Sequence, residues 1–207
     1  MIKISTSILS SNNRIDSIKK INKTNAEYLH IDVMDNIFVP NYQLPVDEIN
    51  KLSPYSDKPL DIHLMTINPE SYIKKIDNKN IDSITIHIEI DKDINKLISL
   101  IKEYKYKVGL AIKPNTDLSL LTPYINKIDK IIVMSVEPGF GGQKFIDNTV
   151  SRIKSIKNIR KDILIEVDGG INNETIKKIR DIADIAVVGS YITNSNDYNE
   201  ATNNLKK

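Results

Sequence analysis

Short runs of aliphatic, mostly β-branched residues recur along the chain at a steady interval. Eight of them are predicted as strands: Ile2–Leu9, Tyr28–Val33, Leu60–Met65, Ser83–Ile88, Lys107–Ile112, Lys130–Ser135, Ile163–Val167 and Asp184–Val188. Several are apolar at consecutive positions, which is typical of parallel strands covered by helices. Eight runs in 207 residues give a period of about 26 residues, enough for a helix in each connection.

The segments between these runs show the spacing of amphipathic helices. Isoleucine or leucine recurs every three or four residues in 15–21, 94–101 and 153–159. Helix starts are predicted at 68–70, where Asn precedes Pro and Glu, and at 172–174, where two Asn precede Glu.

Alternation of strand and helix predicts a parallel sheet, and eight repeats predict a closed (β/α)₈ barrel. A doubly wound open sheet is the alternative that periodicity leaves open. No Pro-rich or Ser-rich linker interrupts the pattern, so residues 1–207 are interpreted as one domain. The tail, 198–207, is predicted as a solvated helix.

Composition narrows the class of protein. Hydrophobic residues make up 40% and charged residues 27% of the chain, and the formal net charge is +2. This balance gives no support to a nucleic-acid or membrane partner. No run approaches the ~20 apolar residues of a membrane span, and the first residues lack a signal-peptide pattern, so we expect a cytoplasmic protein. The lack of cysteine excludes a thiol nucleophile and a thiolate metal site.

All three histidines fall within predicted strands, toward the carboxyl ends where a parallel barrel carries its active site. His30 and Asp32 are two residues apart, so their side chains share one face of the strand, opposite Leu29 and Ile31. Such polar groups are costly inside a barrel unless they bind something. His87 is interpreted as a hydrogen-bonded structural histidine, with a role in supporting the site as the alternative.

One further segment repeats this combination of residues, and another adds a carboxylate at the end of a strand. Asp61 and His63 are two residues apart on the next predicted strand, and Asp168 ends a later one. Two imidazoles and two carboxylates suit Zn²⁺, Mn²⁺ or Fe²⁺ better than Ca²⁺ or Mg²⁺. Spacing alone leaves a second interpretation open, in which these are ordinary polar pairs near a barrel rim.

Glycine is scarce, and its placement is uneven. The chain has 7 glycines, whereas average usage of roughly 7% predicts about 14. Gly109 lies alone on a predicted strand, where we expect it to serve packing. The other six follow the last three predicted strands, in Gly139-Phe140-Gly141-Gly142, Gly169-Gly170 and Gly189-Ser190. Because phosphate often binds at such loops of a barrel, we predict a phosphate site there, with plain tight turns as the alternative.

Seven blocks lie in order between Ser7 and Ser190. They are Ser7-Ile8-Leu9-Ser10, His30-Ile31-Asp32-Val33-Met34-Asp35, Phe38-Val39-Pro40-Asn41, Asp61-Ile62-His63-Leu64-Met65, Val136-Glu137-Pro138-Gly139-Phe140-Gly141-Gly142-Gln143, Glu166-Val167-Asp168-Gly169-Gly170 and Gly189-Ser190. Together they resemble the ribulose-phosphate 3-epimerase family, over nearly the whole chain.

The resemblance implies a (β/α)₈ barrel that interconverts D-ribulose 5-phosphate and D-xylulose 5-phosphate in the pentose phosphate pathway. One divalent metal ion would bind to His30, Asp32, His63 and Asp168, with Zn²⁺ as the first choice and Fe²⁺, Mn²⁺ and Co²⁺ as alternatives. Asp32 and Asp168 would be the acid/base pair on opposite faces of the sugar.

The resemblance also implies substrate contacts, from Ser7, His63 and Asp168. The phosphate end would be held by Gly139, Phe140, Gly141, Gly142, Gly169, Gly170, Gly189 and Ser190. Met34, Met65 and Met134 would cap the enediolate intermediate and keep it dry. A homo-oligomer, either a dimer or a hexamer, is expected as well.

The chain departs from the family pattern after the second predicted strand. Asn36 replaces the usual Gly, and Ile37 replaces a commonly seen His. Asn adopts left-handed backbone geometry more readily than most residues, so we expect the loop to keep its shape.

Three other functions compete with this interpretation. Allulose-6-phosphate 3-epimerase performs the same chemistry on a longer sugar, but Gly141, Gly142 and Gly170 favour the ribulose enzyme. A non-catalytic barrel that binds a sugar phosphate would not need both Asp32 and Asp168. A metal-free lyase or synthase barrel would leave the histidines unexplained.

Overall fold

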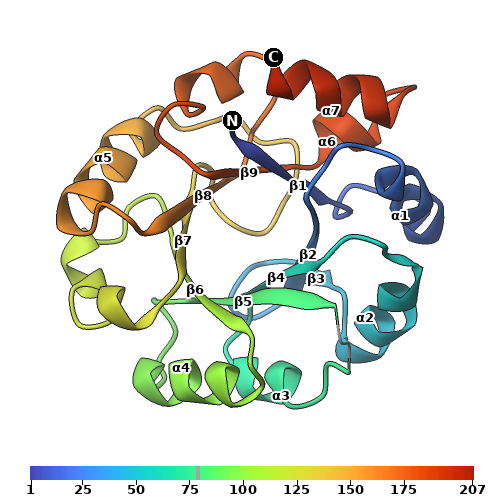
Figure 1. Cartoon of the computed structure of the whole chain (residues 1–207). Coiled ribbons are helices and arrows are strands. Elements are labelled where there is room, and N and C mark those ends of the chain that lie inside the picture. The colour runs from blue at the N-terminus through green and yellow to red at the C-terminus, as the bar shows by residue number, and fades with distance from the viewer. Residues whose placement is uncertain (78–79) are drawn as a thin grey trace.

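The hydrophobic runs form a closed parallel barrel in the computed structural model, which describes residues 1–77 and 80–207 (Figure 1). Its strands are β1 (Lys3–Ser7), β2 (Tyr28–Asp35), β4 (Leu60–Met65), β5 (Ile81–His87), β6 (Lys107–Ile112), β7 (Lys130–Met134), β8 (Leu164–Asp168) and β9 (Ile185–Val188). Each strand pairs in parallel with the next, and β1 pairs with both β2 and β9, which closes the ring. The predicted (β/α)₈ barrel is confirmed, and the open sheet is excluded.

A short strand that the sequence pattern does not predict lies beside the barrel. β3 (Tyr42–Gln43) pairs antiparallel with Met34 and Asp35 at the end of β2. It has only two residues, both at least partly exposed, so it carries no hydrophobic run. The pairing braces the loop that leaves β2.

Helices surround the barrel (Figure 1). Those in the described residues are α1 (Arg14–Asn22), α2 (Val46–Leu52), α3 (Pro69–Ile73), α4 (Ile94–Glu103), α5 (Thr149–Ile159), α6 (Ser190–Thr193) and α7 (Tyr198–Lys206). Short 3₁₀ helices add η1 (Ser53–Tyr55), η2 (Leu118–Leu121), η3 (Ile125–Lys127) and η4 (Thr175–Lys178). None of the helices described is long and apolar enough to cross a membrane.

Two connections differ from the predicted strand–helix unit. After β6 the chain forms η2 and η3, and Pro123 between them cannot donate the backbone hydrogen bond of a continuous helix. After β8 it forms only η4, although Asn172 accepts hydrogen bonds from Glu174 N and Thr175 N at the predicted start. The start signal is therefore present, but the helix that follows is a single 3₁₀ segment.

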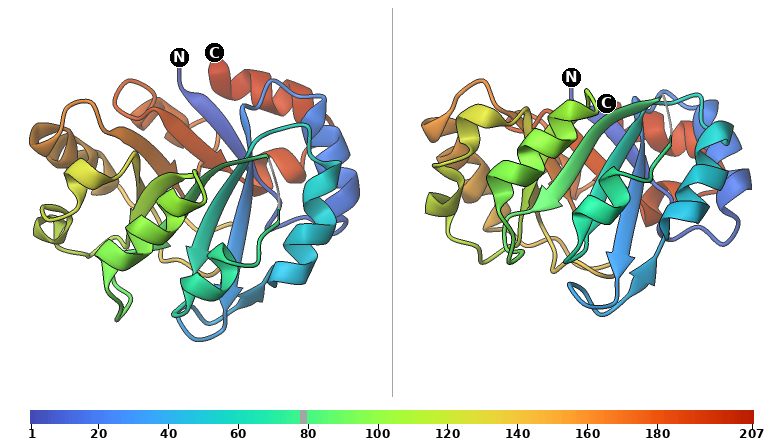
Figure 2. Two further views of the ribbon diagram at one scale, coloured as in Figure 1. Left: turned by 60° about the horizontal axis from the view of Figure 1, so that its bottom comes forward. Right: turned by 90° about the horizontal axis from the view of Figure 1, so that it is seen from below.

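The terminal helix was predicted to be solvated, and this prediction is wrong for one of its faces. Tyr198, Ala201 and Leu205 of α7 are buried. The Tyr198 hydroxyl lies 3.2 Å from Ser17 Oγ of α1 and donates to Thr193 O at 3.0 Å. The N- and C-termini lie near each other in this region, as all the views of Figures 1 and 2 show.

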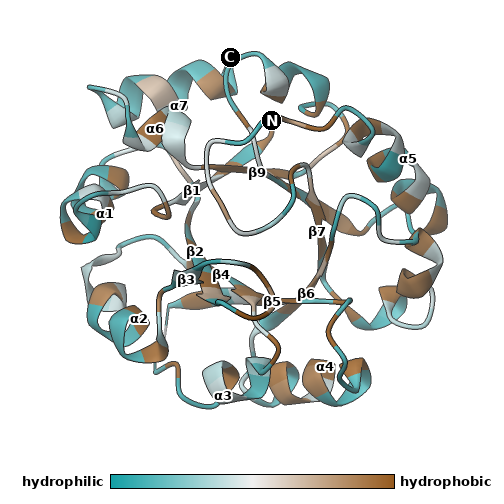
Figure 3. Ribbon diagram, turned by 180° about the vertical axis from the view of Figure 1, so that it is seen from behind, coloured by the Kyte–Doolittle hydropathy of each residue, from teal (hydrophilic) through white to brown (hydrophobic). Residues whose placement is uncertain are grey.

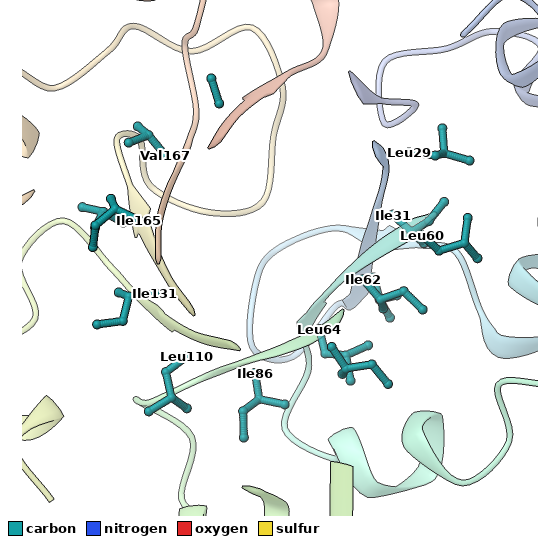
Figure 4. Close-up of a cluster of buried hydrophobic side chains, with 14 of the residues drawn as sticks. Leu29, Ile31, Leu60, Ile62, Leu64, Ile86, Leu110, Ile131, Ile165 and Val167 are labelled. Atoms are coloured by element: carbon teal, nitrogen blue, oxygen red, sulfur yellow. The ribbon is translucent and has the colours of Figure 1, made fainter. Parts of the chain in front are cut away.

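The outward face of the strands forms the main hydrophobic core. Its side chains point away from the barrel axis toward the helices, as Figure 4 shows for Leu29, Ile31, Leu60, Ile62, Leu64, Ile86, Leu110, Ile131, Ile165 and Val167. The helices carry both hydrophobic and hydrophilic residues around their circumference, as expected for a layer between this core and water (Figure 3).

The inward face is unusually polar for a barrel of this kind. Asp61 accepts hydrogen bonds from Ser5 Oγ at 2.8 Å and Ser83 Oγ at 3.0 Å. Gly109 also faces the interior, where an added Cβ would lie 2.1 Å from Thr85 Oγ1. The prediction that Gly109 serves packing is confirmed.

Candidate active site

Four predicted side chains converge inside the barrel. His30 and Asp32 come from β2, His63 from β4 and Asp168 from the end of β8. Their nearest ligand atoms all lie within 4.8 Å of one another. Two features of the sheet bring them together: alternation along each strand turns them inward, and the register places Asp32 opposite His63.

Each histidine directs one nitrogen toward both carboxylates. His30 Nε2 lies 3.4 Å from Asp32 Oδ1 and 4.0 Å from Asp168 Oδ2. His63 Nδ1 lies 3.3 Å from Asp168 Oδ2 and 3.7 Å from Asp32 Oδ1. Three members of the two pairs that the sequence suggested, His30, Asp32 and His63, therefore join Asp168 in one cluster. Asp61, the fourth member, lies outside this cluster and contacts His30 Nδ1.

The cluster fits a divalent cation. His30 Nε2 and His63 Nδ1 are buried and make no hydrogen bond within the described residues, so a neutral ring with its proton on the other nitrogen offers a lone pair there. Their other nitrogens are engaged, His30 Nδ1 at 2.8 Å from Asp61 Oδ2 and His63 Nε2 at 2.9 Å from His87 Nε2. This combination, one free nitrogen and one held by a partner, is typical of histidines that bind metals.

The electrostatics of the cluster favour positive charge at its centre. Burial on its own would lower the pKa of His30, but the charges of Asp32 and Asp61 outweigh it and raise that pKa well above its usual value. Burial would likewise raise the pKa of Asp32, yet the charge of His30 and hydrogen bonding from His30 and His63 lower it. Protons on the imidazoles or a bound cation can supply this charge.

A second group of ligand atoms lies deeper in the barrel, formed by His30, Asp61 and Glu166. Here Lys130 supplies the positive charge. Its Nζ lies 2.5 Å from Glu166 Oε2 and forms a short ion pair with Asp61. All these side chains are almost completely buried, and the two carboxylates raise the pKa of Lys130 despite its burial. The sequence pattern gives no sign of this network, because each partner comes from a different strand.

A cavity of about 310 Å³ opens above the four-residue cluster. Asp32 and Asp168 line it together with Ser7, and all three predicted methionines, Met34, Met65 and Met134, are on its wall. His30 and His63 have no exposed surface and are absent from the lining. The direct contact between His63 and substrate stays a prediction.

The glycine-containing loops predicted to bind phosphate all line this cavity. The residues from these loops are Gly139, Phe140, Gly141, Gly142, Gly169, Gly170, Gly189 and Ser190. Gly170 has a φ of +62°, and an added Cβ would lie 2.6 Å from Phe145 N, so no other residue fits without a backbone shift. The loop after β7 reaches across the barrel mouth, where Asn41 Nδ2 donates to Gly139 O at 2.7 Å (Figure 1).

Several lining residues were not predicted. Ser10, Asn172, Tyr191 and Asn194 belong to this wall. Ser10 stands in a block that carries the family resemblance and Asn172 in a predicted helix start, so both had a signal. Tyr191 and Asn194 reach the cavity through the position of α6, for which the sequence gives no pattern.

The loop after β2 keeps its shape without the usual glycine. Asn36 has a φ of +60°, as expected for its left-handed position. Asp35 accepts hydrogen bonds from the N–H groups of Ile37 and Phe38, and from Ile67 N on the neighbouring loop. Ile37 is 70% exposed and makes no part of the cavity wall.

Comparison with known proteins agrees with this geometry. Residues 3–193 match the model of the Ribulose-phosphate 3 epimerase family. The chain belongs to the ribulose-phosphate 3-epimerase family. Membership makes it an isomerase that acts on carbohydrates. It is 36% identical to the ribulose-phosphate 3-epimerase of Bacillus subtilis (strain 168), covering 100% of this chain and 99% of the relative. The Aquifex aeolicus (strain VF5) enzyme is 39% identical, covering 87% and 84%.

Solved structures with much lower sequence identity share the fold of this epimerase family member. KGPDC from Streptococcus mutans superposes with a TM-score of 0.74 at 13% identity, covering 100% of this chain and 96% of the other. The 3-hexulose-6-phosphate synthase from Salmonella typhimurium gives 0.68 at 18% identity, covering 99% and 96%. At these identities the likeness supports the barrel alone.

Proposed function

We propose that this chain inverts C3 of D-ribulose 5-phosphate to give D-xylulose 5-phosphate, as a cytoplasmic step of the pentose phosphate pathway, and that residues 1–207 form one epimerase domain. The observation that carries the proposal is the placement of Asp32 and Asp168 on the lining of one cavity, above two buried histidines. Family membership supplies the class of substrate.

The reaction needs two proton-transfer groups. A proton α to the C2 carbonyl must leave C3, and a proton must return to the opposite face of the planar enediolate. One carboxyl group must therefore begin ionised and the other protonated. Asp32 and Asp168 provide this pair from different strands, β2 and β8.

The chain holds Asp32 in position from the side of β1. Ser7 Oγ donates to Asp32 Oδ2 at 2.6 Å, and Leu9 N donates in turn to Ser7 Oγ at 3.1 Å. This short chain of hydrogen bonds fixes one Asp32 oxygen and leaves Oδ1 facing the histidines. Ser7 therefore serves to orient Asp32 as well as to line the cavity.

His30, Asp32, His63 and Asp168 would hold one divalent ion, with Zn²⁺ as the first choice, whose charge would stabilise the negative charge that develops on the C2 and C3 oxygens. Met34, Met65 and Met134 would exclude water from the plane of the intermediate. Backbone N–H groups of the glycine-containing loops and of Ser190 would bind the phosphate, which orients the sugar without taking part in the proton transfer.

A coupled assay with two substrates tests the proposal. D-ribulose 5-phosphate and D-allulose 6-phosphate are supplied to the purified, metal-supplemented protein, and kcat/KM is measured for each. We expect the pentose phosphate to be preferred by about tenfold or more, because the curated relatives that the chain matches are ribulose-phosphate 3-epimerases. A preference for the hexose phosphate would assign the chain to the longer sugar, and binding without turnover of either would indicate a non-catalytic barrel.

A further inference from the structure

His87, at the end of β5, lies outside the four-residue cluster but contacts it directly. Its side chain is completely buried. Its Nε2 is 2.9 Å from His63 Nε2, and its Nδ1 is 2.9 Å from Glu89 Oε2. Both ring nitrogens of His87 are therefore occupied, one by the cluster and the other by a carboxylate.

The two imidazole rings meet edge to edge. Their centroids are 5.0 Å apart with an interplanar angle of 23°, and the short distance joins two nitrogens on facing edges. A hydrogen bond between two nitrogens holds one proton, so one ring must donate and the other accept.

The surroundings of Glu89 decide which ring donates. Glu89 Oε1 accepts hydrogen bonds from Lys113 N at 2.7 Å and from Thr116 Oγ1. Two donors on Oε1 favour the ionised form of Glu89, and an ionised carboxylate has no proton to donate. Its second oxygen, which faces His87 Nδ1, therefore accepts a hydrogen bond from that nitrogen. His87 therefore carries its proton on Nδ1, and its Nε2 accepts from the N–H of His63. The Nδ1 of a neutral His63 is then left with a lone pair.

The lone pair on His63 Nδ1 also points in a defined direction. His63 Nδ1 faces Asp168 and Asp32 and makes no hydrogen bond within the described part of the chain. The His87 ring, which contacts His63, is itself packed against Phe38, with ring centroids 4.7 Å apart. Lys113 Nζ lies 4.0 Å from the centroid of the Phe38 ring. These contacts restrict rotation of His87, and hence of His63.

We infer that His87 and Glu89 are positioning residues, which fix the tautomer of His63 and direct its Nδ1 lone pair into the four-residue cluster. His30 is held by a carboxylate directly, through Asp61, whereas His63 is held by one through an intervening imidazole. The inference rests on the proposed function only in taking the cluster as a cation site.

Two substitutions of one residue separate this role from simple packing. In His87→Gln the side-chain oxygen reaches the position of Nε2 and can accept from His63, while the amide N–H₂ can donate to Glu89. In His87→Asn the shorter amide can reach Glu89 but not His63. Both variants place a polar amide at the same buried position, so a difference between them reports the hydrogen bond to His63 and not the loss of the imidazole ring.

Affinity for Zn²⁺ is measured by competition with a chromophoric chelator, with no substrate present. We expect His87→Asn to bind Zn²⁺ about 10–100-fold more weakly than the unsubstituted protein and His87→Gln to stay within about threefold of it. Unchanged affinity in His87→Asn, or equal losses in both variants, would overturn the inference.

A measurement on the unsubstituted protein does not depend on whether the variants fold. Long-range ¹H–¹⁵N spectra of the Zn²⁺-loaded protein report which nitrogen of each histidine carries the proton. We expect Nδ1–H for His87 and Nε2–H for His63, and an Nε2–H tautomer of His87 would contradict the inference. Neither readout uses turnover. If the sugar-phosphate assay failed while these results held, the proposed function would be wrong and the positioning role would stand.

Discussion

Asp168 occupies the boundary between strand and loop. It is the last residue of β8, its side chain is 14% exposed, and Gly169 with a φ of +118° turns the chain away directly after it. The carboxylate thus stands at the floor of the cavity, while Glu166 and Val167, which precede it, are buried. Among the four clustered side chains it has the greatest access to a bound molecule.

Substitution of Asp168 tests the two-carboxylate chemistry. In Asp168→Asn one proton-transfer group is lost with almost no change in size, so we expect kcat to fall by at least about 10²-fold at saturating metal. Circular dichroism and the melting temperature check the fold, and the exposed Asp181→Asn serves as the control for loss of one negative charge. A turnover close to that of the unsubstituted protein would refute the assignment.

Lys130 is expected to matter for stability. In Lys130→Met the charges of Asp61 and Glu166 lose their buried partner, and we expect a loss of about 3–5 kcal/mol in the free energy of unfolding. Urea denaturation measures it. Adding Glu166→Gln removes one of the uncompensated charges and should restore part of the loss. Unchanged stability in the single variant would show that the network contributes little.

The sequence predicts individual residues well where covalent geometry decides the outcome. His30 and Asp32, and likewise Asp61 and His63, face the same side because side chains alternate along any strand. Lys130 was predicted only as the first residue of a strand. Its partners lie on β4 and β8, and no local pattern records which strands face each other across the barrel.

At the scale of elements, the strands were predicted closely and the connections less so. The limits of β4 and β6 match the prediction. β3 was missed, and 3₁₀ segments replace helices after β6 and β8. Such short elements depend on prolines, caps and neighbouring loops more than on hydrophobic spacing.

The loops after β8 and β9 provide a matched pair of glycine substitutions. In Gly170→Ala the new Cβ would meet backbone at 2.6 Å in a left-handed conformation, whereas in Gly189→Ala the nearest atom is 3.7 Å away. We expect Gly170→Ala to lose at least about 1–2 kcal/mol of stability, and Gly189→Ala far less. Thermal unfolding measures both. Equal melting temperatures would show that the loop after β8 rearranges freely.

For the whole molecule, the arrangement of the site predicts a dependence on divalent metal. Treatment with a chelator should abolish epimerase activity, and adding Zn²⁺, Mn²⁺, Fe²⁺ or Co²⁺ back should restore it. Because a ligand that binds only the folded state stabilises it, metal at 100 times its Kd should add about 2.7 kcal/mol to the free energy of unfolding. Full activity in protein shown to be metal-free by elemental analysis would exclude the metal role.

The origin of the four clustered side chains has a further consequence. They come from β2, β4 and β8, so they join an early part of the chain to a late one. The sequence has no cysteine and hence no disulfide bond. An ion held by these four side chains would act as a reversible cross-link that closes a loop spanning most of the barrel. Any partly unfolded state that kept the ion bound would have a lower conformational entropy than the same state without it. Release of the ion would then be an early event in the opening of the barrel.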